Sequence, residues 1–78
     1  MFLEIVTPDA KIYSGDVKLI QVPGTVGKFE IMNNHAPIIS TLTKGKIKVI
    51  DNDKKTQYFD IKGGVVEVNK NKIIVLAE

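Results

Sequence analysis

Residues that favour turns interrupt this chain at short intervals, and this spacing constrains the fold more than any other feature. Glycine, proline, asparagine and aspartate mark turns because they tolerate or impose special backbone angles. The strand-like segments that lie between the turn signals are four to six residues long, which suits strands and is too short for most helices. The turn signals are Thr7-Pro8-Asp9, Ser14-Gly15-Asp16, Pro23-Gly24, Asn33-Asn34, Lys44-Gly45, Asp51-Asn52-Asp53, Lys62-Gly63-Gly64 and Asn69-Lys70-Asn71.

The residues between these turns also favour strands. Val, Ile and Thr account for 25 of the 78 residues, whereas Leu and Ala account for seven, and β-branched side chains suit a pleated surface. Several segments alternate as half-buried strands do, for example Phe29 and Ile31 around Glu30. The sequence therefore predicts an all-β sandwich or barrel without a helix. The expected strands are Phe2–Val6, Ala10–Tyr13, Val17–Val22, Lys28–Met32, Ile38–Thr43, Lys46–Ile50, Thr56–Ile61, Val65–Val68 and Lys72–Ala77.

Length and charge exclude several classes of protein. A chain of 78 residues allows one domain, expected over residues 1–78. It has no cysteine, which excludes disulfide frameworks, thiol catalysis and zinc-thiolate sites. The net charge is only +2, and arginine is absent, so a nucleic-acid partner is not expected. The first residues lack a basic region, and a secretory signal peptide is therefore not expected either.

Catalytic and metal sites are not expected. The single histidine, His35, has no second ligand or orienting group near it in the sequence. We interpret it as a loop residue that contacts its own backbone or a protein partner. No nucleophile elbow, phosphate-binding loop or zinc-protease motif is present, so we expect neither a cofactor nor a metal.

Two binding functions remain open alternatives. Asp53-Lys54-Lys55 occupies a predicted hairpin tip, where lipoyl and biotinyl carrier domains present their modified lysine. A small all-β carrier or binding module is therefore the alternative function, although a charged turn explains the same residues. Five aromatic residues could form a base-stacking platform, but core packing explains them more simply. They are Phe2, Tyr13, Phe29, Tyr58 and Phe59.

A series of short motifs in a fixed order is more specific than these features. It resembles the N-terminal domain of the epsilon subunit of bacterial F-type ATP synthase, which is called delta in mitochondria. That family shows a first strand ending in Ser/Thr-Pro, an aromatic-Ser-Gly turn, a Gly-x-x-Gly loop, and His-Ala-Pro before two aliphatic residues. The matching strings are Leu3-Glu4-Ile5-Val6-Thr7-Pro8, Ile12-Tyr13-Ser14-Gly15, Ile20-Gln21-Val22-Pro23-Gly24, Gly27-Lys28-Phe29-Glu30-Ile31 and Asn34-His35-Ala36-Pro37-Ile38-Ile39.

The rest of the chain extends the resemblance and also departs from it. Lys44-Gly45-x-Ile47, Gly63-Gly64-x-x-Glu67-Val68 and Val75-Leu76-Ala77 match later family features. The family's Gly-Glu-Leu-Gly-Ile-x-Pro-Gly-His is replaced by a version with Lys28 at an acidic position and Asn33-Asn34 as the turn. The chain stops where the family usually continues into a C-terminal helical hairpin. Without that hairpin, we expect the subunit neither to bind ATP nor to inhibit ATP hydrolysis by the extended-hairpin mechanism.

The resemblance implies a β-sandwich of two roughly five-stranded sheets that serves as a non-catalytic rotor subunit. Such a subunit would link the gamma subunit to the proton-carrying c-ring and, indirectly, to the alpha/beta catalytic head. It would couple proton flow to ATP synthesis, peripherally bound on the cytoplasmic side of the bacterial cell membrane.

By position in the family pattern, two groups of residues are expected at interfaces. The c-ring-facing residues are Gly27, Lys28, Phe29, Glu30 and His35, and the gamma-facing residues are Thr7, His35 and Ser40. Thr7 could instead be a plain turn residue, and Ser40 a strand residue that faces solvent. Lys28 and Glu30 alternate with Phe29 and Ile31, so they should point away from the core.

Overall fold

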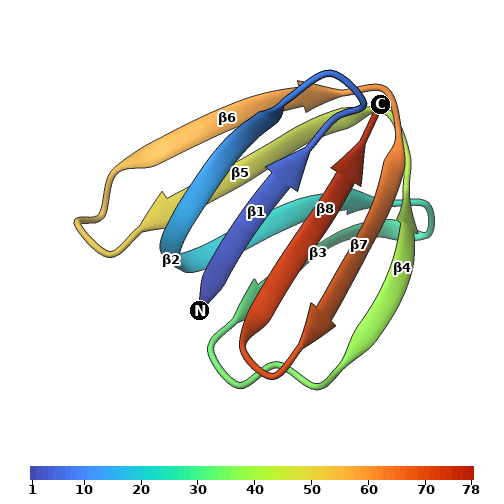
Figure 1. The fold of residues 1–78 in the computed structure, drawn as a ribbon. Helices are drawn as coiled ribbons and strands as arrows, with labels where there is room; N and C mark the ends of the chain where they lie inside the picture. The colour runs from blue at the N-terminus through green and yellow to red at the C-terminus, as the bar shows by residue number, and fades with distance from the viewer.

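The computed structural model describes residues 1–78 and consists of eight strands and no helix (Figure 1). The all-β prediction is therefore confirmed. The structure contains no helix that could span a membrane. The strands are β1 Phe2–Val6, β2 Lys11–Gly24, β3 Gly27–Met32, β4 Ile38–Leu42, β5 Gly45–Asp51, β6 Thr56–Ile61, β7 Gly64–Asn69 and β8 Lys72–Ala77.

One expected turn does not exist. Apart from Ala10, the predicted strands Ala10–Tyr13 and Val17–Val22 belong to one continuous strand, β2, which also includes Ser14-Gly15-Asp16. These three residues pair with β1, and Gly15 lies opposite Leu3. Ladder hydrogen bonds to β1 hold this stretch extended and override the local preference for a turn. Strand β2 ends with Pro23-Gly24, so the turn expected there lies instead at Thr25-Val26. The other predicted strands agree with the structure to within one residue at either end.

The length of β2 allows it to serve both layers of a sandwich. Up to Asp16 it pairs with β1, and from Val17 onward it pairs with β5 and β3. One layer therefore has the order β4-β7-β8-β1-β2, and the other has the order β3-β2-β5-β6 (Figure 1). The layers contain five and four strands, close to the two five-stranded sheets expected. At its far end, Gly24 of β2 pairs with Leu42 of β4, which joins the layers a second time.

The core lies between the two layers. It consists of 15 buried hydrophobic residues, and no polar or charged residue is buried. Every strand contributes to it, mainly from alternate positions, as period-2 patterning requires. In β2 the alternation breaks between Val17 and Ile20, where the pairing with β5 shifts register. The fully buried members include Leu3, Ile20, Ile47 and Val66. A core of this kind leaves the outer face of each layer, the turns and the strand edges as the only places for a functional site.

Candidate functional site

The titratable side chains form no reactive cluster. No three His, Asp or Glu side chains lie close enough together to hold a metal ion. His35 Nδ1 lies 2.7 Å from the carbonyl oxygen of Ala36, and the His35 backbone N–H donates to the carbonyl of Met32 at 3.2 Å. The histidine is thus held by its own loop, which matches the interpretation that it contacts its own backbone.

Two groups have displaced pKa values, and contacts within the fold explain both. A hydrogen bond from Lys11, whose Nζ lies 2.6 Å from the Glu4 carboxylate, lowers the pKa of Glu4. Partial burial raises the pKa of Tyr13, and the charge of Asp51 adds to this effect. The Tyr13 ring packs edge-on against Phe59, with 5.6 Å between ring centroids. Neither group faces an enclosed cavity that could hold a substrate, so the functional features are surfaces.

The β2–β3 hairpin presents the first group of expected contact residues. Gly27 begins β3 with a φ of 142°, a backbone conformation that L side chains rarely adopt. The tip is tied to β4 because the Thr25 N–H donates to the Thr41 carbonyl at 3.2 Å and the two threonine hydroxyls lie 3.1 Å apart. Val26, the next residue after Thr25, is fully exposed, at 102% of its reference area. The tip is therefore a fixed projection with an apolar end.

Along β3 the side chains alternate as the sequence predicts. Phe29 packs against the core and Ile31 is fully buried, while Lys28, Glu30 and Met32 are exposed on the outer face. Lys28 and Glu30 make no ion pair. Both charges are therefore available to contact a partner, whereas the Phe29 ring packs against the core.

His35 lies at the other end of β3, in the loop between β3 and β4. The Asn34 N–H donates to Asn71 Oδ1 in the β7–β8 turn at 3.0 Å, and the Met1 ammonium donates to Asn33 Oδ1 at 3.0 Å. These bonds hold the loop beside the turn and the N-terminus, as Figure 1 shows. The structure therefore does not bring Gly27 and His35 together, because the full length of β3 separates them.

Thr7 and Ser40, expected to face gamma, are also apart. The Thr7 hydroxyl accepts hydrogen bonds from the Asp9 and Ala10 N–H groups at 3.3 and 3.2 Å and donates to the Ala10 carbonyl at 3.1 Å. It thus closes the β1–β2 turn. Ser40 is half-buried on the inner side of β4, between Ile38 and Leu42, rather than facing solvent. Two strands, β8 and β7, lie between β1, which Thr7 follows, and β4, which carries Ser40.

The outer face of the five-stranded layer is a surface that sequence reasoning missed. Val6 of β1, Leu76 of β8 and Val65 of β7 are direct neighbours across the strands. In the next row, Glu67 lies between Ile74 and Ile39. Ile39 is 74% exposed and Leu76 56% exposed. The alternating pattern indicates that these side chains share one side of each strand, but the strand order that gathers them is not visible in the sequence.

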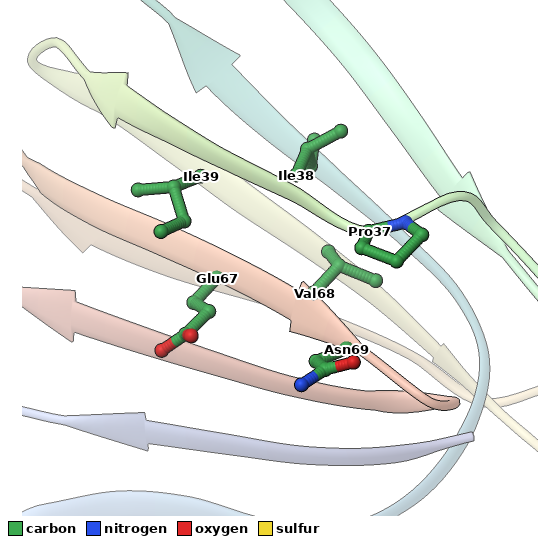
Figure 2. Close-up of a pocket in the computed structure, with 6 residues that line it drawn as sticks. All are labelled: Pro37, Ile38, Ile39, Glu67, Val68 and Asn69. Carbon is green, nitrogen blue, oxygen red and sulfur yellow. The ribbon is translucent and has the colours of Figure 1, made fainter.

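This face is also hollowed. A shallow depression of about 380 Å³ lies where β4 meets β7 (Figure 2). There Ile39 and Glu67 lie side by side on neighbouring strands, with Asn69 at the end of β7. A second depression on the other side of Glu67 reaches Lys72 and Ile74. We refer to the surface formed by Val6, Ile39, Val65, Glu67, Ile74 and Leu76 as the β7 face.

The four-stranded layer has a smaller apolar row on its outer side. Leu19 lies opposite both Met32 and Ile50, and Met32 is 55% exposed. Charged and polar residues, among them Lys48 and Glu30, flank this row. The molecule thus has an apolar area on each broad side.

The β5–β6 hairpin carries Asp53-Lys54-Lys55, the possible carrier site, and its tip is a charged turn. Asp51 Oδ1 accepts hydrogen bonds from the Asp53 and Lys55 N–H groups, both at 2.9 Å. Lys54 has a φ of 65°, which places it in the left-handed region. Both lysines are exposed. The turn is fixed by its own hydrogen bonds, and nothing in its geometry sets one lysine apart as a modification site.

Comparison with known proteins gives a consistent result. The family model described as "ATP synthase, Delta/Epsilon chain, beta-sandwich domain" matches residues 1–78. The ATP synthase epsilon chain of Chlorobium limicola is 43% identical over 97% of this chain and 86% of its own length. That of Caulobacter vibrioides is 38% identical over 100% of this chain and 90% of its own. The epsilon chain of Campylobacter hominis is 44% identical, but this chain spans only 60% of it.

Solved structures share the fold at low sequence identity. A chain of the Euglena gracilis mitochondrial ATP synthase, in an assembly of OSCP, F1 and c-ring, superimposes with a TM-score of 0.91 at 21% identity. The match covers 96% of this chain and 48% of that one. A chain of the Tetrahymena thermophila central stalk and c-ring gives a TM-score of 0.83 at 18% identity, covering 99% of this chain and 62% of that one.

Proposed function

This chain belongs to the family of ATP synthase delta/epsilon β-sandwich domains, and we propose that it acts as the epsilon-type subunit of the central stalk, between the gamma subunit and the c-ring. The single observation that supports this most strongly is the match of the family over residues 1–78, with 43% identity to an epsilon chain of which this chain spans 86%. In this role the subunit catalyses no reaction and couples proton flow to ATP synthesis mechanically.

The fold suits a part that transmits torque. β2 runs through both layers, and its end pairs with β4, so the two layers are joined by backbone hydrogen bonds at two places. The core is apolar throughout and contains no buried polar group that lacks a partner. A close-packed interior resists compression and transmits strain. Such a sandwich deforms little under load, so a force applied at one end is transmitted to the other end.

We assign the c-ring contact to the β2–β3 hairpin and the outer face of β3. The unpaired charges Lys28 and Glu30 and the exposed Val26 lie there on a tip that Thr25 and Thr41 hold in place. Gly27 provides the backbone conformation of the turn. Phe29 supports the strand from inside, and His35 belongs to the opposite end.

We assign the gamma contact to the five-stranded layer and the loop that carries His35. Thr7 and Ser40 belong to this layer, and their hydroxyls already bond to backbone groups. Their part in the interface would be to shape the β1–β2 turn and the inner side of β4. The complex would hold the subunit at the cytoplasmic side of the bacterial cell membrane, with the alpha/beta head as an indirect partner.

Reconstitution tests the proposed function. Membrane vesicles that carry a synthase depleted of its epsilon subunit should pump protons poorly when ATP is supplied. Addition of this chain is expected to restore ATP-driven acidification, because it links the c-ring to gamma again. Vesicles that acidify equally well with and without the chain would overturn the proposal. The variant Lys55→Glu, which changes a charge in the β5–β6 turn of the whole chain, is the control for nonspecific effects of charge and should restore acidification as the wild type does.

A further inference from the structure

The loop between β3 and β4, residues 33–37, is attached to the rest of the molecule by polar contacts. None of its side chains is buried or belongs to the hydrophobic core. Packing therefore does not fix its conformation, and hydrogen bonds must do so. Only two join the loop to segments that are distant in the sequence. The Asn34 N–H donates to Asn71 Oδ1, and the Met1 ammonium donates to Asn33 Oδ1, both at 3.0 Å.

The loop begins with a β-turn whose central peptide can point in two directions. The His35 N–H donates to the Met32 carbonyl at 3.2 Å and closes this turn. Its third residue, Asn34, has a φ of 64°, whereas its second residue, Asn33, has no positive φ, which is the pattern of a type II turn. A type I turn differs by a flip of the central peptide, which gives the third residue a negative φ. Residues other than glycine favour negative φ, so an additional contact must select the form observed.

Asn71 makes that contact. The N–H of Asn34 belongs to the central peptide of the turn, so a flip would point it away from Asn71 Oδ1 and break the hydrogen bond. Asn71 is itself fixed, because its carbonyl accepts a hydrogen bond from the Phe2 N–H at 3.0 Å. One residue of the β7–β8 turn thus joins the start of β1 to the β3–β4 loop, at the end of the molecule where these segments lie together (Figure 1).

We propose that Asn71 is a positioning residue, whose Oδ1 holds the peptide between Asn33 and Asn34 in the type II orientation that the partner of the His35 loop meets. This role rests on the proposed function, because the loop belongs to the surface assigned to gamma. The orientation of the peptide determines where the Asn33 carbonyl and the Asn34 side chain point, and both residues are exposed next to His35. A loop already held in its binding form avoids the entropic cost of ordering when the partner binds.

Substitutions in the β7–β8 hairpin of the whole chain test this role. Asn71→Gly removes the Oδ1 acceptor, but it tolerates the φ of 63° and keeps the carbonyl that Phe2 contacts. Asn71→Asp keeps an acceptor oxygen at the same position and should behave as the wild type does. Lys70→Gly, where φ is 49°, introduces glycine into the same turn without removing the contact. Asn69→Asp, at an exposed position, controls for the charge that Asn71→Asp introduces.

Amide hydrogen exchange measured by NMR reports on the loop directly. In Asn71→Gly we expect the Asn34 amide to exchange about fivefold faster than in the wild type, because its N–H loses its acceptor. Core amides such as that of Val66 should not exchange faster, since glycine is favoured in this position of a type I′ turn. The other three variants should keep the rate at Asn34 within about twofold. An unchanged rate at Asn34 in Asn71→Gly would overturn the proposal.

Binding of purified cognate gamma subunit tests the consequence for the partner. We expect the dissociation constant to rise about fivefold for Asn71→Gly and to change by less than about twofold for the other three variants. Faster exchange with unchanged affinity would overturn the positioning role and leave the proposed function intact. Equal weakening by Asn71→Gly and Asn71→Asp, with Asn69→Asp unaffected, would show that the acceptor oxygen is not what matters and would also overturn it. If the wild-type chain does not bind gamma at all, the proposed function fails, and the positioning role fails with it.

Discussion

Gly27 and His35 lie at opposite ends of the same strand: Gly27 is the first residue of β3, at the hairpin tip, and His35 follows the last residue of β3 by three positions. Five residue steps of extended chain span about 17 Å. A contact with the c-ring that included both residues would have to run along the whole of β3. We therefore regard the hairpin tip with Lys28 and Glu30 as one contact and the loop with His35 as another.

Reversing the charge of Lys28 should impair coupling. Lys28 is exposed on the outer face of β3 and makes no ion pair, so it is free to meet an acidic or carbonyl-rich loop of the c-ring. In Lys28→Glu we expect slower ATP-driven proton pumping by the reconstituted synthase, with the folded chain unchanged in stability. Lys55→Glu at the β5–β6 tip should pump like the wild type. Unchanged pumping in Lys28→Glu would show that the ring contact does not depend on this charge.

Replacing Gly64 by alanine should destabilise the chain severely. Gly64 has a φ of 151°, and a Cβ there would collide with the Leu76 carbonyl oxygen and approach the Ala77 Cα to 3.1 Å. Backbone atoms of a paired strand cannot move aside, so we expect a loss of about 3 kcal/mol in unfolding free energy, measured by urea denaturation. Gly15→Ala is the control. Its Cβ would meet only the Tyr13 ring at 3.7 Å, and a change within about 1 kcal/mol is expected.

Replacing Lys70 by glycine should stabilise the chain. Lys70 and Asn71 connect β7 to β8 and have φ values of 49° and 63°, as the central residues of a type I′ turn do. A lysine pays a steric cost in this conformation that glycine avoids, so Lys70→Gly should raise the unfolding free energy by about 1 kcal/mol. Lys44→Gly, where φ is not positive, should lower it instead. A destabilised Lys70→Gly variant would contradict the turn geometry.

The ion pair of Glu4 should make stability depend on pH in the acidic range. The hydrogen bond from Lys11 lowers the pKa of Glu4 below its ordinary value of 4.5, so the folded state favours the ionised carboxylate. This stabilisation is present above pH 4.5 and is lost as the pH falls through the lowered pKa of the folded state. The wild type should therefore exceed Glu4→Gln in unfolding free energy at about pH 7, and the difference should vanish at about pH 2. A difference that does not change with pH would assign the effect of the substitution to packing.

Local patterns in the sequence were sufficient to predict the strands. Alternation around Glu30 correctly placed Phe29 and Ile31 inside and Lys28 outside, because a strand turns successive side chains to opposite faces. The same kind of reasoning failed at Gly15. The turn signal there is overridden because Gly15 pairs with Leu3. These residues are twelve positions apart, so the preferences of the neighbouring residues do not indicate the contact.

The candidate surfaces required the strand order as well. Ile39, Glu67 and Ile74 are spread over 36 positions of the sequence, and their adjacency follows from the pairing of β4 with β7 and of β7 with β8. Likewise, nothing local indicates that Asn34 meets Asn71 and thereby holds the His35 loop at the end opposite Gly27. Motif order correctly indicated the family, but it gave each contact residue a position only along the chain, not in space.

Co-purification with gamma tests the central role most directly. Tagged chain and separately expressed cognate gamma subunit are mixed and analysed by size-exclusion chromatography with mass detection. A stable complex of one chain with one gamma subunit is the result expected of a central-stalk subunit. The absence of a complex, with both proteins shown to be folded, would contradict that role and leave only a sandwich of the epsilon family whose partner is another molecule.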